Sequence, residues 1–370
     1  MAFCNRDKSK IMKLLKIAAV NILIFLGLII FLNLTVITIY QLSHLKLSSH
    51  ASAHSNWKLP NYKNIEWARA HFTEWSNLKS EYRSYIGWRR LPYKGQTINI
   101  DEKGIRMTPQ SEFVTTKSPL VIFSGGSTMW GSGVDDANTI PAIFAKIAEG
   151  RYRAMNLGEQ GYNSFQGYLF LKLQIIDGLR PNIVVCYDGV NDSHILKPGL
   201  RPFSHQREDQ IREIMKGKDT QKEETLSFSH FFLSPLKYYI FQYKDNNSND
   251  KIGDISQERI NQTAKALLEG WLSTKDLAEK QGSDFVAILQ PNAAFGKPYL
   301  KHLKLKEDRL KHYKLLYPAI LKLLQTPRYQ ELSNKVLVLT DVFDLNEPIY
   351  IDDCHVSPNG NKIIAQKIYD

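Results

Sequence analysis

Short apolar runs alternate with helix-length stretches over the last two-thirds of the chain. Each run fits one buried strand, and each stretch between runs can supply a crossover helix. Strands joined by such crossovers form a parallel sheet with helices on both faces, so we expect an α/β fold. The predicted strands are Leu120–Phe123, Arg153–Asn156, Ile183–Tyr187, Phe285–Gln290 and Val336–Thr340. The predicted helices are Ile140–Ala148, Phe165–Gly178, Ser256–Gln281 and Leu303–Leu324.

An uncharged apolar run, Ile17–Tyr40, lies near the N-terminus. A helix of about 20 apolar residues can span a bilayer. Basic residues are concentrated before the run, at Arg6, Lys8, Lys10, Lys13 and Lys16. This asymmetry predicts a cytoplasmic tail (residues 1–16), a transmembrane signal-anchor (residues 17–40) and an extracytoplasmic remainder, facing the periplasm of a bacterium. The alternative is a cleaved signal with a site near Ala51-Ser52-Ala53, but the run exceeds the usual signal core.

Composition sets broad limits on the rest of the molecule. Hydrophobic residues make up 43% and charged residues 23%, which are ordinary globular values and exclude a disordered chain. The net charge of +11 favours anionic partners, but the chain lacks the motifs of nucleic-acid-binding proteins, and we expect no nucleic-acid partner. With only three cysteines, Cys4, Cys186 and Cys354, we expect free thiols.

Two segments stand outside the alternating pattern. Residues 41–117 are interpreted as a stalk and lead-in segment, with an amphipathic helix near Ile65–Tyr82 and a hairpin or edge element near Thr97–Ile100. Residues 118–370 then form the main domain. Within that domain, Lys197–Ile255 is predicted to be a partly flexible insertion that serves as a lid or partner surface.

A Gly-Gly-Ser-Thr segment follows the first predicted strand and contains Ser127. Glycines allow a sharp turn off the strand, and the next residues can begin a helix with free N–H groups. Ser127 is therefore a candidate nucleophile whose own amide could help to bind an oxyanion. The α/β-hydrolase elbow requires glycine two residues after the serine, where this chain has Met129.

The other candidate residues follow later strands. Gly161 comes after the second strand and Asn191 after the third, and both could donate N–H groups to an oxyanion. His355 follows the fifth strand and is the candidate base, oriented by Asp352, with Asp353 as the competing acid. The carboxyl ends of parallel strands lie at one edge of a sheet, so these residues should converge there.

A metal or cofactor is not expected. The ten histidines are scattered along the sequence without a Cys/His cluster, and no Walker or dinucleotide-binding pattern is complete.

The chain resembles the SGNH hydrolases, also called the GDSL esterase/lipase superfamily, over roughly Ser118 to Asp370. The resemblance lies in four short blocks in this order, which contain Ser127, Gly161, Asn191, and Asp352 with His355. The resemblance implies a flavodoxin-like three-layer α/β/α fold with a parallel five-stranded sheet. It also implies Ser127 as nucleophile, Asp352 and His355 as its partners, and an oxyanion hole from Ser127, Gly161 and Asn191. The serine block departs from the family's Gly-Asp-Ser-Leu. The stretch from Ile86-Gly87-Trp88-Arg89 to Gly104-Ile105-Arg106 resembles a lead-in of some bacterial extracytoplasmic members.

The resemblance and the predicted anchor together imply a membrane-bound serine esterase. Its expected substrate is an ester, first an O-acetyl group on envelope carbohydrate. Three alternatives remain open: an O-acyltransferase with the same triad, a non-catalytic assembly or binding subunit, and a lipid ester hydrolase. The last would use the aromatic cluster Phe228–Tyr243.

Overall fold

The computed structural model describes residues 2–47, 56–223, 255–305 and 307–370. The chain forms two compact units. One unit is Met1–Ala51 with Arg212–Lys251, and the other is Ser52–Ile211 with Ile252–Asp370. The predicted cluster Phe228–Tyr243 and most of the predicted insertion's second half lie outside the described residues.

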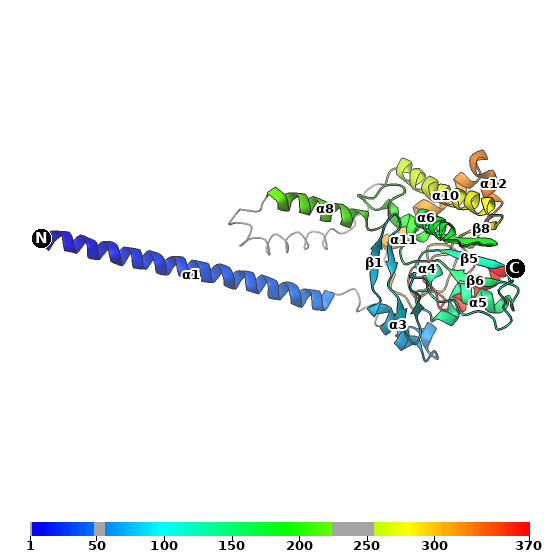
Figure 1. Cartoon of the computed structure of the whole chain (residues 1–370), viewed down its shortest axis with the longest axis horizontal. Coiled ribbons are helices and arrows are strands. Elements are labelled where there is room, and N and C mark those ends of the chain that lie inside the picture. The colour runs from blue at the N-terminus through cyan, green and yellow to red at the C-terminus, as the bar shows by residue number, and fades with distance from the viewer. Residues whose placement is uncertain (1, 48–55, 224–254, 306) are drawn as a thin grey trace. The chain divides into compact units, whose positions relative to one another are not determined.

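The first unit contains α1 (Ala2–Leu47), which is one continuous helix (Figure 1). Its 24-residue stretch Met12–Thr35 is long and apolar enough to cross a membrane, and a signal sequence has the same properties. The stretch begins and ends earlier than the predicted Ile17–Tyr40. It includes Lys13 and Lys16 near its N-terminal end. Lysine side chains at such a position can extend their ammonium groups toward water.

The second unit is built on a five-stranded parallel sheet with strand order β6-β5-β7-β8-β9. This is the flavodoxin-like order, in which the first strand lies second from the edge. The predicted strands are all present, with β5 and β7 extended by one or two residues beyond the predicted ends. Their bounds are β5 (Leu120–Gly125), β6 (Arg153–Asn156), β7 (Ile183–Asp188), β8 (Asp284–Leu289) and β9 (Val336–Val338).

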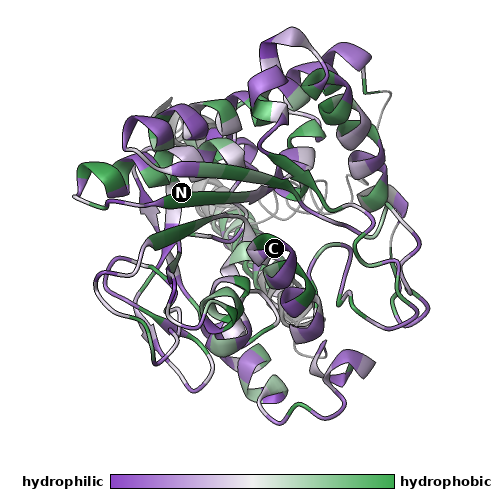
Figure 2. Cartoon of the chain, turned by 90° about the vertical axis from the view of Figure 1, so that its right-hand side faces the viewer, coloured by the Kyte–Doolittle hydropathy of each residue, from purple (hydrophilic) through white to green (hydrophobic). Residues whose placement is uncertain are grey.

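Successive side chains of a strand point to opposite faces of the sheet, which creates two separate cores. In β5, Leu120 and Ile122 belong to one apolar cluster, whereas Val121 and Phe123 belong to the other. Both faces are covered by helices, so the central strands are apolar over most of their length (Figure 2). The sheet is thus the buried middle layer.

Helices pack on each face as a parallel sheet requires. On one face α10 contacts α6, α11 and the sheet, and on the other α5 contacts α13 and β6. The helix bounds are α5 (Ile140–Ile147), α6 (Ser164–Ile176), α10 (Gln257–Lys280), α11 (Glu307–Leu324), α12 (Gln330–Ser333) and α13 (Pro358–Tyr369). The three-layer α/β/α prediction is confirmed. The helix predicted from Leu303 begins only at Glu307.

The lead-in segment differs from its prediction. A helix, α3, covers only Ala68–Asn77, and residues Ser80–Arg83 form strand β1 instead of continuing it. The reason is tertiary: β1 pairs antiparallel with β2 (Gly87–Arg90), and such pairing overrides local helical periodicity. The expected hairpin near Thr97–Ile100 is present as β3 (Tyr93–Lys94) and β4 (Asn99–Ile100).

Candidate active site

The chain turns sharply at the carboxyl end of β5 and begins the short helix α4 (Ser127–Trp130) at Ser127. A Cβ on Gly126 would overlap the Nδ2 atom of Asn191, so only glycine leaves room for that amide. The N–H of Ser127 lies in the first helical turn, where backbone donors lack intrahelical acceptors. The turn therefore presents both a hydroxyl and a backbone donor beside Asn191.

Three predicted residues meet at this turn. His355 Nε2 lies 2.7 Å from Ser127 Oγ, and His355 Nδ1 lies 2.7 Å from Asp352 Oδ2. Asp352 Oδ1 also accepts the backbone N–H groups of Cys354, at 2.9 Å, and His355, at 2.7 Å. The turn that carries them is closed by an antiparallel bridge between Tyr350 and Val356. Serine, imidazole and carboxylate thus form one continuous chain of hydrogen bonds.

The environment of Asp352 sets the tautomer of the imidazole. Burial raises the pKa of the Asp352 carboxyl, but the facing His355 and the hydrogen bonds outweigh burial and hold the pKa at about 2. At neutral pH the carboxylate can only accept, so His355 Nδ1 carries the proton in this hydrogen bond. Nε2 of the neutral ring is then left as an acceptor for the Ser127 hydroxyl.

The competing acid, Asp353, lies in a different environment. Its Oδ2 accepts the hydroxyl of Tyr313 at 2.5 Å, and its side chain is buried next to α11. Burial, together with nearby Cys354 and the Asp353 carboxylate, raises the pKa of the Tyr313 hydroxyl well above its ordinary value. Asp353 is therefore placed to hold α11 against this turn.

Both predicted oxyanion donors lie near Ser127. Asn191, in α7 (Val190–Ser193), is buried and donates from Nδ2 to the carbonyl of Tyr162 at 2.8 Å. An amide NH₂ group has two donors, so one N–H is left beside Gly126. Gly161 directly precedes Tyr162, so the same contact brings the Gly161 turn to this edge of the sheet.

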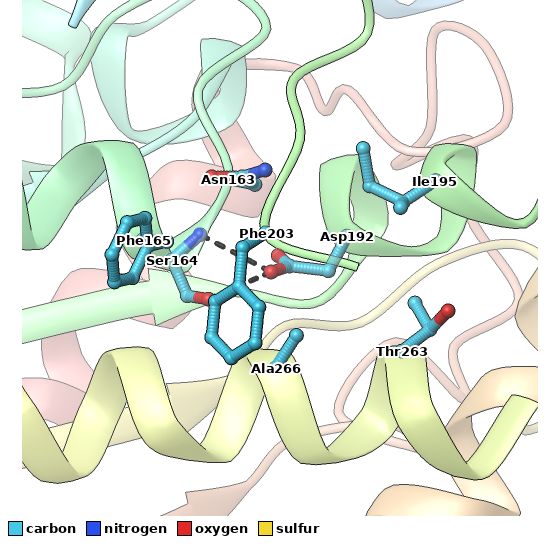
Figure 3. Close-up of a pocket in the computed structure, with 8 residues that line it drawn as sticks. All are labelled: Asn163, Ser164, Phe165, Asp192, Ile195, Phe203, Thr263 and Ala266. Atoms are coloured by element: carbon cyan, nitrogen blue, oxygen red, sulfur yellow. Dashed lines mark hydrogen bonds between the residues drawn. The ribbon is translucent and has the colours of Figure 1, made fainter. Parts of the chain in front are cut away.

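A buried acid joins the loops that carry these donors. Asp192 Oδ1 accepts the backbone N–H of Ser164 at 3.2 Å and its hydroxyl at 2.7 Å, which ties α7 to the start of α6 (Figure 3). Burial raises the pKa of Asp192, although the Ser164 hydrogen bonds oppose the shift. Neighbouring Asp188 accepts the indole N–H of Trp271 at 2.8 Å, and burial raises its pKa well above the ordinary value.

One group of potential metal ligands lies among the described residues, formed by Asp352, Cys354 and His355 within 4.8 Å of one another. Both imidazole nitrogens of His355 are engaged, one with Asp352 and the other with Ser127. A metal would have to break one of these hydrogen bonds, so the donor set fits proton transfer better than metal binding.

Sequence reasoning gave no role to two buried arginines of the lead-in. Arg106 donates to the carbonyls of Trp130 at 3.0 Å, Gly131 at 2.7 Å and Val134 at 2.7 Å, and to Asp136 Oδ1 at 2.8 Å. It thus holds the chain that follows Ser127. The lead-in resemblance was the only signal, because an arginine that binds distant carbonyls has no local pattern.

Arg89 holds the loop between β6 and Gly161. It pairs with Glu159 at 3.6 Å, and the two side chains are only 2% and 0% exposed. Glu159 also accepts the backbone N–H of Arg90 at 3.1 Å and that of Gln160 at 2.7 Å. The loop that leads to Gly161 is therefore held from β2.

No family model and no curated protein matches this chain. Solved structures that match it include a carbohydrate acetylesterase family member from Sinorhizobium meliloti, at 12% identity and TM-score 0.38, covering 68% of this chain and 95% of that chain. A member of the lipolytic protein G-D-S-L family from Veillonella parvula matches at 11% identity and TM-score 0.37, covering 68% and 96%. A GDSL-like lipase from Bacteroides thetaiotaomicron matches at 15% identity and TM-score 0.35, covering 69% and 87%.

Proposed function

We propose that this chain is a serine esterase of the SGNH type, with Ser127 as nucleophile, His355 as general base and acid, and Asp352 as its orienting carboxylate. One observation carries the proposal: the unbroken hydrogen-bond chain from Asp352 through His355 to Ser127 at the carboxyl edge of the sheet. Serine is a weak nucleophile unless a base takes its proton, and this geometry supplies that base.

In the first half of the reaction, Ser127 Oγ attacks the ester carbonyl carbon while His355 Nε2 takes the hydroxyl proton. The carbonyl oxygen becomes an oxyanion and accepts N–H groups of Ser127, Gly161 and Asn191. The ester C–O bond then breaks, and His355 returns the proton to the departing alcohol. The acyl group remains on Ser127.

In the second half, water attacks the acyl-enzyme and gives its proton to His355. The tetrahedral intermediate collapses, the acid leaves, and Ser127 regains its proton. Each oxyanion donor of this kind lowers the barrier by about 3 kcal/mol, because it is aimed at charge that develops only in the transition state.

We place the substrate among O-acetylated carbohydrates outside the cytoplasm. The support is the helix that can span a membrane, with its basic residues on the N-terminal side, which favours an extracytoplasmic second unit. An esterase held there meets the cell envelope.

The test uses the purified full-length chain in detergent with a chromogenic acetyl ester. Ser127→Ala should reduce kcat by at least about 10³-fold, since the nucleophile is lost. Ser84→Ala, at an exposed serine in the β1–β2 turn, should retain full activity.

Equal turnover by wild type and Ser127→Ala would contradict the proposal. If wild type acylates Ser127 but releases product only when a sugar acceptor is added, the enzyme is an acyltransferase and water is not its natural acceptor. Mass spectrometry of the intact protein distinguishes these outcomes, because the acyl-enzyme carries the added mass.

A further inference from the structure

We infer that Trp88 is a positioning residue for the Gly161 amide, a role that rests on the proposed function. The Trp88 indole N–H donates to the carbonyl oxygen of Gln160 at 2.8 Å. That carbonyl and the Gly161 N–H belong to the same peptide group. The indole therefore anchors the very peptide whose N–H would face the oxyanion.

The indole is fixed on several sides. Trp88 is 3% exposed, and its own backbone carbonyl accepts the Tyr162 hydroxyl at 2.5 Å. The Tyr162 and His205 rings contact it edge-on, with centroids 5.7 Å and 5.3 Å away. The Arg207 guanidinium lies 4.4 Å from the ring centroid. A ring confined in this way cannot turn its N–H away from Gln160 without repacking.

Gly161 is confined as closely. Its φ of +78° is favourable only for glycine, a Cβ there would overlap the Gln206 side chain, and it would lie 3.2 Å from Trp88 Cζ2. On the other side, the N–H of Gln160 is bound by Glu159 Oε1 at 2.7 Å. Glu159 thus holds the peptide group before Gln160, and Trp88 holds the carbonyl of the Gln160–Gly161 peptide group.

Two physical effects follow from the indole contact. A peptide whose carbonyl accepts a hydrogen bond is polarised, and its N–H becomes a stronger donor. A donor that is already oriented also needs no reorganisation when the oxyanion forms. Both effects act in the transition state and leave ground-state binding of substrate largely unchanged, so they raise kcat.

Trp88→Phe keeps an aromatic ring for Arg207 and Tyr162 but removes the indole donor together with part of the ring volume. We expect kcat for the acetyl ester to fall about 10-fold with KM within 2-fold of wild type, because the oxyanion donor remains but is less polarised and less fixed. Trp67→Phe, in the separate apolar cluster around Tyr62, is the matched control and should keep wild-type kcat.

A second measurement reports the peptide directly and does not depend on activity. The sequence contains three Gln–Gly pairs, Gln160-Gly161, Gln166-Gly167 and Gln281-Gly282. Labelling Gln carbonyl carbons with ¹³C and Gly nitrogens with ¹⁵N selects these peptides in the full-length protein. In Trp88→Phe the Gln160 carbonyl carbon and the Gly161 nitrogen should move upfield, and the other two pairs should stay in place.

The outcomes separate this inference from the proposed function. An active wild type with an unchanged kcat in Trp88→Phe would overturn the positioning role. Unchanged Gln160 and Gly161 signals would overturn it as well. An inactive wild type whose Gln160-Gly161 signals still move in Trp88→Phe would contradict the esterase proposal. It would confirm the Trp88 contact but overturn its catalytic role.

Discussion

Asp352 and Asp353 are chemically identical neighbours that enter opposite environments. Asp352 accepts three hydrogen bonds, from His355 Nδ1 and from the backbone N–H groups of Cys354 and His355. Asp353 instead accepts the Tyr313 hydroxyl. Adjacent side chains of an extended segment diverge, so only one of the two was expected to face His355, and the Asp-x-x-His block of the resemblance matched Asp352. What the sequence could not supply was the partner of Asp353, since Tyr313 lies on a distant helix.

Asp352→Asn should lower kcat by about 10²- to 10⁴-fold, because an amide can donate to Nδ1 and thereby favour the wrong tautomer of His355. Asp353→Asn keeps an acceptor for Tyr313 and should stay within a few-fold of wild type. Steady-state kinetics on the chromogenic ester decides between them. A larger loss in Asp353→Asn than in Asp352→Asn would assign the orienting role to Asp353 instead.

The same pair allows a pH measurement. The pKa of Asp352 is lowered on folding, from 3.8 to about 2, so its contribution to stability is complete above pH 4. As pH falls from about 4 through about 2, the carboxylate is protonated first in the unfolded state and then in the folded state, and the contribution is lost. The difference in free energy of unfolding between wild type and Asp352→Asn should therefore shrink over that interval.

At the scale of elements, the strands could be predicted from the sequence because their apolar runs are local and are buried on both faces of the sheet. The positions of Ser127, Gly161, Asn191 and His355 followed from one rule, that parallel strands end at a common edge. The error at Ile65–Tyr82 has the opposite cause. Residues from Ser80 onward pair with β2, and no local pattern reveals that partner.

The lead-in elements stabilise the site through buried arginines. Arg106→Met would remove, at a fully buried position, the guanidinium that donates to three carbonyls and to Asp136 Oδ1. We expect a loss of about 3–5 kcal/mol in the free energy of unfolding, measured by urea titration of the full-length protein.

Arg83→Met is the matched control for this variant. Arg83 pairs with Glu81 on the surface, where both side chains are about half exposed. Exposed pairs of this kind contribute about 0–1 kcal/mol. A loss of that size in Arg106→Met would mean that the lead-in does not brace the loop after Ser127.

For the whole molecule, the decisive property is the side of the membrane on which the second unit lies. The basic residues before Met12–Thr35 favour an extracytoplasmic second unit. An alkaline phosphatase fused after residue 370 should be active in cells. A green fluorescent protein fused at the same place and exported by the general secretion route should be dark. The reversed pattern would contradict the proposed orientation.

The distance along the chain between the two halves of the site bears on biosynthesis. Ser127 precedes His355 by 228 residues, and all five strands lie before the turn that carries the imidazole. A ribosome therefore releases Ser127, the proposed nucleophile, long before His355, its proposed base, and the sheet can assemble before the two side chains meet. Under the proposed function, ester cleavage would begin only when the segment that carries His355 docks beside Ser127, late in the synthesis of the domain.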